Sequence, residues 1–281
     1  MRSLKDIHIK QDEDWRAYND YRKKRVKGFE TGIQALDQEV LGLTGIVGIQ
    51  GAPGSCKSTL AMQVASYNAS KGTPVLFVDR ENGKHRFKDR LISQLFQIPP
   101  KAVKEASDES ARRFYDRLTA LDLYVDTEPC NSEAIRGYLE EMWTSYKKPM
   151  LLVVDSLQSM PKDGPDERLS LQKWLEELDQ MKLDYVDKLT IIMTSEKSRG
   201  KYKEGTNDGG KGTGSIEYKC ELLFDIRLDE SSGLLFLDLV KNRDGATFQN
   251  HALAKVMASA DPNSFTFRLE DADYEPESER Y

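Results

Sequence analysis

The sequence predicts an α/β domain built around a mostly parallel sheet, and two observations lead to that prediction. Across the middle of the chain, apolar runs rich in Val, Ile and Leu alternate with amphipathic helical stretches. This alternation is typical of parallel strands that helices cover on both faces. After residue 220 the strand-like runs follow one another closely, which predicts antiparallel strands added at one edge of the sheet.

The expected strands are short apolar runs bounded by polar or turn-forming residues. They cover residues 45–50, 74–79, 121–126, 150–155, 189–195, 222–228, 234–241 and 265–269. The expected helices are the stretches in which apolar residues recur at helical spacing. They cover residues 57–71, 86–97, 110–118, 132–145 and 170–182.

Composition excludes several classes of protein. The 281 residues carry 41 Lys and Arg against 47 Asp and Glu, a formal net charge of −6. This balance excludes a globally basic coat for nucleic acid but allows a local basic patch. Three separated cysteines without a C-x-x-C pair argue against a disulfide framework and a cysteine-rich zinc site. Without a signal region or a long apolar run, we expect a reduced, cytoplasmic protein that does not span a membrane.

We expect one domain, residues 28–269, between two polar ends. Residues 1–27 form a polar arm with some helical character, and residues 21–27 alone contain five cations. Residues 270–281 are rich in acids and poor in large apolar side chains. We therefore expect an acidic, disordered tail there.

A phosphate-binding loop is the most informative motif. Residues 51–59 read GAPGSCKST, directly between the first expected strand and the first expected helix, which is the context of the G-x-x-x-x-G-K-[ST] loop. Small residues let successive backbone N–H groups point at phosphate oxygens, and the helix adds the positive end of its dipole. Lys57 is expected to contact the β- and γ-phosphates, and Ser58 to hold Mg²⁺. The expected ATP-binding residues are Gly51, Ala52, Pro53, Gly54, Ser55, Cys56, Lys57, Ser58 and Thr59.

Cys56 departs from this motif, because it stands where the second glycine belongs. A Cβ at this position crowds the loop where it lies closest to the phosphates, and a non-glycine residue narrows the allowed backbone angles. Three explanations stay open: the loop tolerates cysteine and binds nucleotide weakly, the site has decayed to a structural remnant, or the position has been altered. A glycine-rich turn without a ligand is a further alternative, but Lys-Ser-Thr in this context favours nucleotide binding.

Two acids at strand ends are expected to complete the site. Asp155 ends the buried run MLLVVD, so it reaches the crevice at the carboxyl end of a central strand and can hold the water shell of Mg²⁺. Glu81 follows the run VLFVD. A carboxylate one strand over from the loop can act as a general base near the γ-phosphate. A solvated acid at a strand end is the alternative for Glu81.

These segments together resemble the RecA-like core ATPases, in particular the DnaB-type replicative helicase domain and its RadA relatives. Residues 29–45 resemble the T-G-x-x-x-L-D segment that precedes the family's first strand, and residues 212–226 resemble its G-S-I-E segment. The sequence LVKNRDGAT at 239–247 closely resembles its Lys-x-Arg-x-Gly segment. The resemblance implies a RecA-like P-loop fold, ATP and Mg²⁺ as ligands, and Glu81 as the residue that polarises the attacking water.

The resemblance also implies roles outside the loop. Lys241 and Arg243 match cations that the family inserts into the ATP site of a neighbouring subunit, where an arginine finger stabilises the transferred phosphoryl group. Alternate residues of a strand share a face, so both cations are expected on one side. A solvated hairpin rim is the alternative. Glu196 falls where the family has a glutamine that senses the γ-phosphate, so it places a negative charge near the phosphates.

The glycine-rich segment 196–214 is locally basic. A flexible basic loop at the carboxyl end of a strand suits contact with a phosphate backbone without sequence reading. In the family, the corresponding loops hold single-stranded DNA. A disordered polar loop is the alternative. The expected DNA contacts are Lys197, Arg199, Lys201, Lys203 and Lys211.

We therefore expect an ATP-dependent translocase or helicase on single-stranded DNA, with replication or recombination partners. A cation lent to the next subunit makes a head-to-tail interface, which closes into a ring, six-fold in the family, or continues as a filament. Two alternatives stay open. One is a RecA- or RadA-like recombination or annealing factor that forms filaments. The other is a nucleotide-binding scaffold with impaired hydrolysis, which Cys56 and Glu196 favour.

Overall fold

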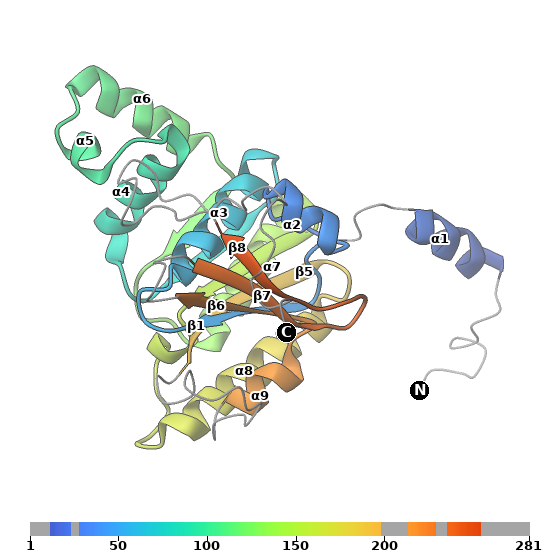
Figure 1. Cartoon of the computed structure of the whole chain (residues 1–281). Helices are drawn as coiled ribbons and strands as arrows, with labels where there is room; N and C mark the ends of the chain where they lie inside the picture. Colours follow the sequence, from blue (N-terminus) through green and yellow to red (C-terminus); the bar gives the residue numbers. More distant parts are fainter. Residues whose placement is uncertain (1–11, 24–27, 198–212, 229–234, 254–281) are drawn as a thin grey trace, which may run out of the picture.

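A mixed β-sheet forms the centre of the molecule. The computed structural model describes residues 12–23, 28–197, 213–228 and 235–253. Within these residues the sheet has eight strands in the order β3-β2-β4-β5-β1-β6-β7-β8. Strands β1, β5, β6, β7 and β8 are labelled in Figure 1. The strands are β1 (Ile46–Gly51), β2 (Val75–Asp79), β3 (Leu123–Asp126), β4 (Met150–Asp155), β5 (Leu189–Glu196), β6 (Leu222–Leu228), β7 (Leu235–Asn242) and β8 (Phe248–Leu253).

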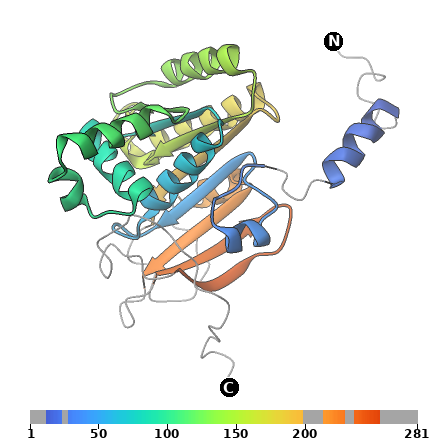
Figure 2. The ribbon, with the colours of Figure 1, turned by 90° about the horizontal axis from the view of Figure 1, so that it is seen from above.

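Helices cover both faces of this sheet, as the view from above shows (Figure 2). Apolar side chains of α2, α3 and α4 pack against one face, and those of α7, α8 and α9 pack against the other. The helices are α1 (Asp12–Lys23), α2 (Gln34–Glu39), α3 (Lys57–Ser70), α4 (Gly83–Phe96), α5 (Pro100–Lys104), α6 (Asp108–Thr119), α7 (Ser132–Tyr146), η2 (Leu157–Ser159), α8 (Glu167–Asp184) and α9 (Thr213–Lys219).

The strand directions confirm the expected α/β class and refine its antiparallel edge. Strands β3, β2, β4, β5 and β1 are parallel neighbours. Strand β6 also pairs in parallel with β1, with Val47 opposite Leu222, so the antiparallel part begins only at β7. The expectation of antiparallel strands directly after residue 220 was therefore wrong for β6. A long connection containing α9 separates β5 from β6, which permits a parallel crossover.

Two apolar layers hold the sheet in place. The central strands β1, β2 and β4 are buried along their whole length, so their side chains pack against helices above and below. On the α3 side, the ring of Phe77 in β2 meets the ring of Phe87 in α4 edge-on at 4.9 Å. On the α7 side, Leu152 and Val154 of β4 join the cluster of α7 and α8. These layers fix the carboxyl ends of β1, β2 and β4 at one edge of the sheet.

Several predicted elements differ from the observed ones. The expected strand 265–269 lies outside the described residues, as do most of the expected DNA loop and the acidic tail. The structure adds α2, α5, α9 and β8, which were not predicted. Helix α1 lies within the expected polar arm and stands apart from the sheet in Figure 1 and Figure 2. Among the described helices, none combines the length and the apolar character that crossing a membrane requires.

Candidate nucleotide-binding site

The glycine-rich loop joins β1 to α3 at the carboxyl edge of the sheet. Gly54 and Cys56 both have left-handed backbone conformations, with φ of +80° and +65°, and the N–H of Ser55 donates to the carbonyl oxygen of Ala52 at 3.1 Å. Lys57 is the first residue of α3. The loop therefore winds tightly around the N-terminal end of the helix, where backbone N–H groups are free to bind an anion.

Cys56 takes the backbone conformation that a glycine would adopt without strain. A left-handed conformation costs an ordinary residue on the order of 1–2 kcal/mol. The Cys56 side chain packs against the apolar cluster beneath α3, and burial raises the pKa of its thiol. The structure thus keeps the backbone of the phosphate-binding motif while the thiol is partly sheltered from solvent.

Lys57 lies inside the loop and is almost buried. Its Nζ donates to the carbonyl oxygens of Gly51 at 3.1 Å and Ala52 at 2.9 Å. Burial lowers the pKa of Lys57, while the charges of Glu196, Glu81 and Asp155 act in the opposite direction. A cation in this position, beside a helix N-terminus, favours the binding of a multiply charged anion.

Asp155 connects the loop helix to two strands. Its Oδ1 accepts hydrogen bonds from Ser58 Oγ at 3.0 Å and Thr194 Oγ1 at 2.5 Å. Its Oδ2 is buried and has no hydrogen-bond partner in the described part of the chain. Burial, the largest effect, raises the pKa of this carboxyl to about 6. Ser58 and Asp155, the two expected metal ligands, therefore lie together, and oxygen donors of this kind suit Mg²⁺.

Glu81 lines the same cavity, but the strand before it is not the neighbour of β1 that we expected. Strands β4 and β5 lie between β2 and β1, so Glu81 is not one strand over from the loop. The Asp79 Oδ1 accepts hydrogen bonds from the backbone N–H groups of Glu81 and Asn82, and this turn carries the chain across the strand ends. The Glu81 Oε1 accepts hydrogen bonds from Ser156 Oγ at 2.5 Å and Ser159 Oγ at 3.2 Å.

A cavity of about 400 Å³ lies between these groups. The motif residues Pro53, Gly54, Cys56, Lys57, Ser58 and Thr59 line it together with Glu81, Asp155 and Glu196. The cavity also contains residues that the sequence analysis missed. Two of them, Arg86 and Arg90, are four residues apart on α4, a spacing that places side chains on one helix face. Two arginines at this spacing, shortly after Glu81 in the sequence, could have indicated that this helix face contributes to the site. The other missed residues are Asn82, Ser156 and Thr194.

One turn of 3₁₀ helix, η2, lies between Glu81 and Glu196 and is hydrogen-bonded to both. Gln158 donates from Nε2 to Ser195 Oγ at 2.7 Å, and its Oε1 accepts from the backbone N–H of Glu196 at 3.2 Å. The next residue, Ser159, donates to Glu81. The end of β5 and the Glu81 carboxylate are therefore joined by hydrogen bonds through two adjacent residues of η2. The side chain of Glu196 is exposed and lies at the mouth of the cavity.

Lys241 and Arg243 lie far from this cavity in the same chain. Lys241 pairs with Leu223, and Leu223 with Gly48 near the start of β1. Both cations therefore lie near the amino ends of the parallel strands, whereas the loop lies at their carboxyl ends. Lys241 Nζ and Arg243 Nη2 each donate to the carbonyl oxygen of Tyr218 at 3.2 Å. They therefore share one side, as expected, but the structure does not bring them together with the other site residues.

The expected DNA contacts are only partly within the described residues. Lys197 pairs with the buried carboxylate of Asp225, with 2.5 Å between Nζ and Oδ2, so in this structure its charge serves an internal ion pair. Arg199, Lys201, Lys203 and Lys211 lie outside the described residues. DNA binding by this segment stays a prediction.

Comparison with known proteins identifies the family. The sequence profile of the DnaB-like helicase C-terminal domain matches residues 28–204. The chain belongs to this family. A solved structure described as an ATPase domain aligns with a TM-score of 0.78 at 18% identity, covering 94% of this chain and 99% of its own. A DnaB-like replicative helicase, described with its interactions with primase, aligns with a TM-score of 0.77 at 18% identity over 94% of this chain and 69% of its own. No curated protein matches the sequence.

These solved structures show that this DnaB-like domain has the fold that the sequence predicted. At 18% identity, they bear on the fold alone. Their breadth of coverage confirms the RecA-like arrangement of a mostly parallel sheet with an antiparallel edge.

The raised pKa of Asp155 predicts a specific pH dependence of stability without Mg²⁺ and nucleotide. Because the folded pKa, about 6, exceeds the ordinary 3.8, the folded state binds this proton more tightly than the unfolded chain. Its contribution to stability is present at low pH and is lost as the pH rises from about 4 to about 6, on the order of 2–3 kcal/mol. Asp155→Asn should remove this loss. The free energy of unfolding of the variant, measured in urea, should therefore rise relative to that of the wild type between pH 4.5 and pH 7.

An exposed carboxylate provides the control for this measurement. Asp244→Asn should follow the wild type across the same pH range, because Asp244 is exposed. A stability difference between wild type and Asp155→Asn that does not change with pH would contradict the raised pKa.

Proposed function

We propose that this chain is the ATP-hydrolysing motor of a helicase that moves along single-stranded DNA as an oligomer. The observation that carries the proposal is the cavity at the carboxyl edge of the sheet, around which Lys57, Ser58, Asp155 and Glu81 converge from separate elements. Membership of the DnaB-like helicase family supports the same assignment.

The residues present fit a magnesium–nucleotide complex. The loop amides and the start of α3 would bind the phosphates, with Lys57 turning from the loop carbonyls toward them. Ser58 and Asp155 would hold Mg²⁺, and the Asp155 Oδ2 that lacks a partner in the described residues would gain one. Held there, the ion would supply positive charge that stabilises the phosphoryl group during transfer.

Glu81 supplies the general base in this mechanism. Its carboxylate would accept a proton from the water that attacks the γ-phosphate. The hydroxyls of Ser156 and Ser159 hold one carboxylate oxygen, so the other oxygen is left to orient the water. Gln158, which accepts from the Glu196 backbone, and Ser159, which donates to Glu81, are neighbours on η2. A backbone shift at Glu196 would therefore also change the orientation of the Glu81 carboxylate.

Lys241 and Arg243 would act on the site of a neighbouring subunit. Their position at the far edge of the sheet from the loop excludes action within one chain, whereas a head-to-tail neighbour could receive them. Helix α1 supports an oligomer as well, because Trp15 and Tyr18 are 60% and 56% exposed. Such aromatic side chains on a helix apart from its own core suit packing against another subunit.

A nucleotide-binding scaffold with impaired hydrolysis is the second candidate, and one observation favours it. Glu196 lines the cavity, and its charge opposes the burial-induced lowering of the Lys57 pKa, so its carboxylate would repel a γ-phosphate. A filament-forming recombination or annealing factor would use the same head-to-tail contacts, and sizing with a non-hydrolysable ATP analogue separates a discrete ring from an open filament.

ATP turnover tests the motor assignment. We expect hydrolysis that requires Mg²⁺ and rises when single-stranded DNA is added, and we expect Glu81→Gln to lower it by about 10²-fold or more while nucleotide binding persists. The matched control Glu39→Gln changes an exposed carboxylate of α2 and should leave turnover unchanged. Absence of turnover in both the wild type and Cys56→Gly would favour the scaffold.

Mixing two inactive variants tests the lent cation. Arg243→Ala should abolish turnover but retain nucleotide binding, because Arg243 lies outside its own cavity. Lys57→Ala should lose turnover because the phosphate site itself is damaged. In mixed oligomers, intact Lys57 sites can face intact Arg243 neighbours, so turnover should reappear. If the mixture stays as inactive as its components, Arg243 does not act between subunits.

A further inference from the structure

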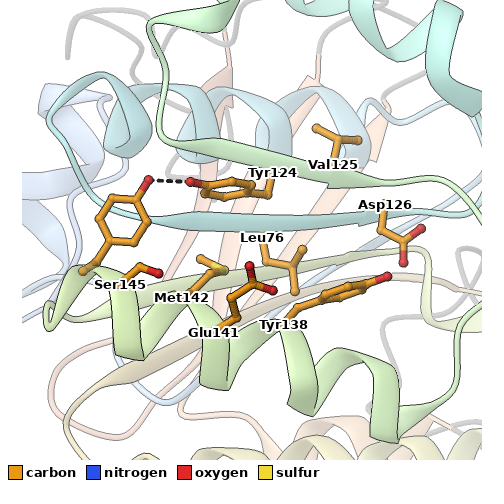
Figure 3. Close-up of a pocket in the computed structure, with 9 residues that line it drawn as sticks. Leu76, Tyr124, Val125, Asp126, Tyr138, Glu141, Met142 and Ser145 are labelled. Carbon is orange, nitrogen blue, oxygen red and sulfur yellow. Dashed lines mark hydrogen bonds between the residues drawn. The ribbon is translucent and has the colours of Figure 1, made fainter.

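A second groove lies beside β3, the outermost strand on one side of the described sheet, and is bounded by helix α7 (Figure 3). Its volume is about 390 Å³, within the range of ligand-binding pockets. Leu76 and Met142, both nearly buried, form its apolar floor. Tyr124 from β3 and Tyr138 from α7 stand along its two sides and are 46% and 41% exposed. Two large aromatic side chains thus stay open to solvent around one hollow.

Hydrogen bonds hold one wall of this groove in place. The hydroxyl groups of Tyr124 and Tyr146 are 2.5 Å apart, and Tyr146 donates onward to Asp122 at 3.0 Å. The two rings meet edge-on, with centroids 6.3 Å apart. The Tyr124 ring is therefore a fixed surface, and a ligand would not have to order it on binding.

The groove is negatively charged. Asp126 and Glu141 both line it, and no cationic side chain does among the described residues. Glu141 makes no ion pair with a residue that the structure describes. Asp126 pairs with Arg80, whose guanidinium lies 3.6 Å away and is 4% exposed. Two carboxylates beside tyrosine faces provide the chemistry that binds a planar cation.

We propose that this groove binds an extended, arginine-bearing segment of a partner protein. A guanidinium can stack on a tyrosine ring while it donates to a carboxylate, and its aliphatic stem fits the Leu76 and Met142 floor. An extended segment is favoured because β3 is the outermost strand at its end of the described sheet. A peptide added along this edge would place alternate side chains on the groove face, the face that Tyr124 and Asp126 share.

The groove also connects to the nucleotide site, and this part rests on the proposed function. Arg80 immediately precedes Glu81 and is held by Asp126 and by Cys130 Sγ, 2.7 Å from its Nη2. Its Nε and Nη1 are buried with no partner among the described residues. An incoming cation would compete with Arg80 for Asp126 and would loosen the residue next to the general base. Occupation of the groove should therefore lower ATP turnover.

Peptide binding to the 281-residue chain tests the proposal directly. The probe is a Gly-Arg-Gly-Arg-Gly amide that carries fluorescein on its N-terminal amine, measured by fluorescence anisotropy, with a citrulline peptide of the same length and label as the neutral comparison. We expect saturable binding of the arginine peptide and none of the citrulline peptide in the same range. Two variants separate the contribution of the carboxylate charge from that of the aromatic ring. Glu141→Gln should weaken binding of the arginine peptide about five-fold. Tyr138→Phe should preserve binding because the ring face remains.

A neighbouring residue gives the matched control. Glu140→Gln removes the same charge from α7 at an exposed position outside the groove and should leave binding unchanged. Equal losses in Glu140→Gln and Glu141→Gln, equal binding of the citrulline peptide, or no binding at all would overturn the proposal. Self-association that Glu141→Gln abolishes would instead make a second copy the occupant and overturn the assignment to a partner protein.

Turnover is measured separately with the same peptide. Binding without any effect on turnover in an active protein would remove the link through Arg80. Binding to a protein that hydrolyses no ATP would leave the groove assignment standing and would contradict only the proposed motor.

Discussion

A single buried carboxylate connects the elements of the nucleotide site. Asp155 ends β4, accepts from Ser58 at the start of α3, and accepts from Thr194 in β5. Its second oxygen has no partner in the described residues, and burial keeps its pKa near 6. An ionised carboxylate in such surroundings is costly unless a cation compensates it. A cation beside Asp155 would compensate this charge, and α3, β4 and β5 all contact or carry the carboxylate concerned.

The sequence predicted the fold well because its central strands β1, β2 and β4 are buried on both faces. A short run rich in Val and Leu such as MLLVVD favours a doubly covered strand, and the loop motif is typical between a strand and a helix. Elements of five to seven residues, such as α2, α5 and α9, carry too few periods to be recognised. The order of strands across a sheet cannot be predicted from local sequence patterns. We therefore expected Glu81 one strand from the loop, although β4 and β5 lie between β2 and β1.

Site residues were predictable where a motif fixed their spacing and were missed where tertiary contacts brought them in. Ser58 and Asp155 were expected to meet, and they do. The serines that hold Glu81 are positioned by the turn after β4 and by η2, and no pattern in the sequence connects them to residue 81. The departures at Cys56 and Glu196 have local consequences. The first costs backbone strain, and the second adds an exposed negative charge to the lining of the cavity.

Equilibrium binding of a non-hydrolysable ATP analogue with Mg²⁺ tests most directly whether the loop still binds a triphosphate. Isothermal titration should show saturable binding to the wild type, with an affinity within about ten-fold of Cys56→Gly because the left-handed backbone is already formed. Lys57→Ala should abolish the signal. A wild type that takes up no analogue at millimolar concentration, or Lys57→Ala binding as well as the wild type, would contradict the nucleotide site and the motor built on it.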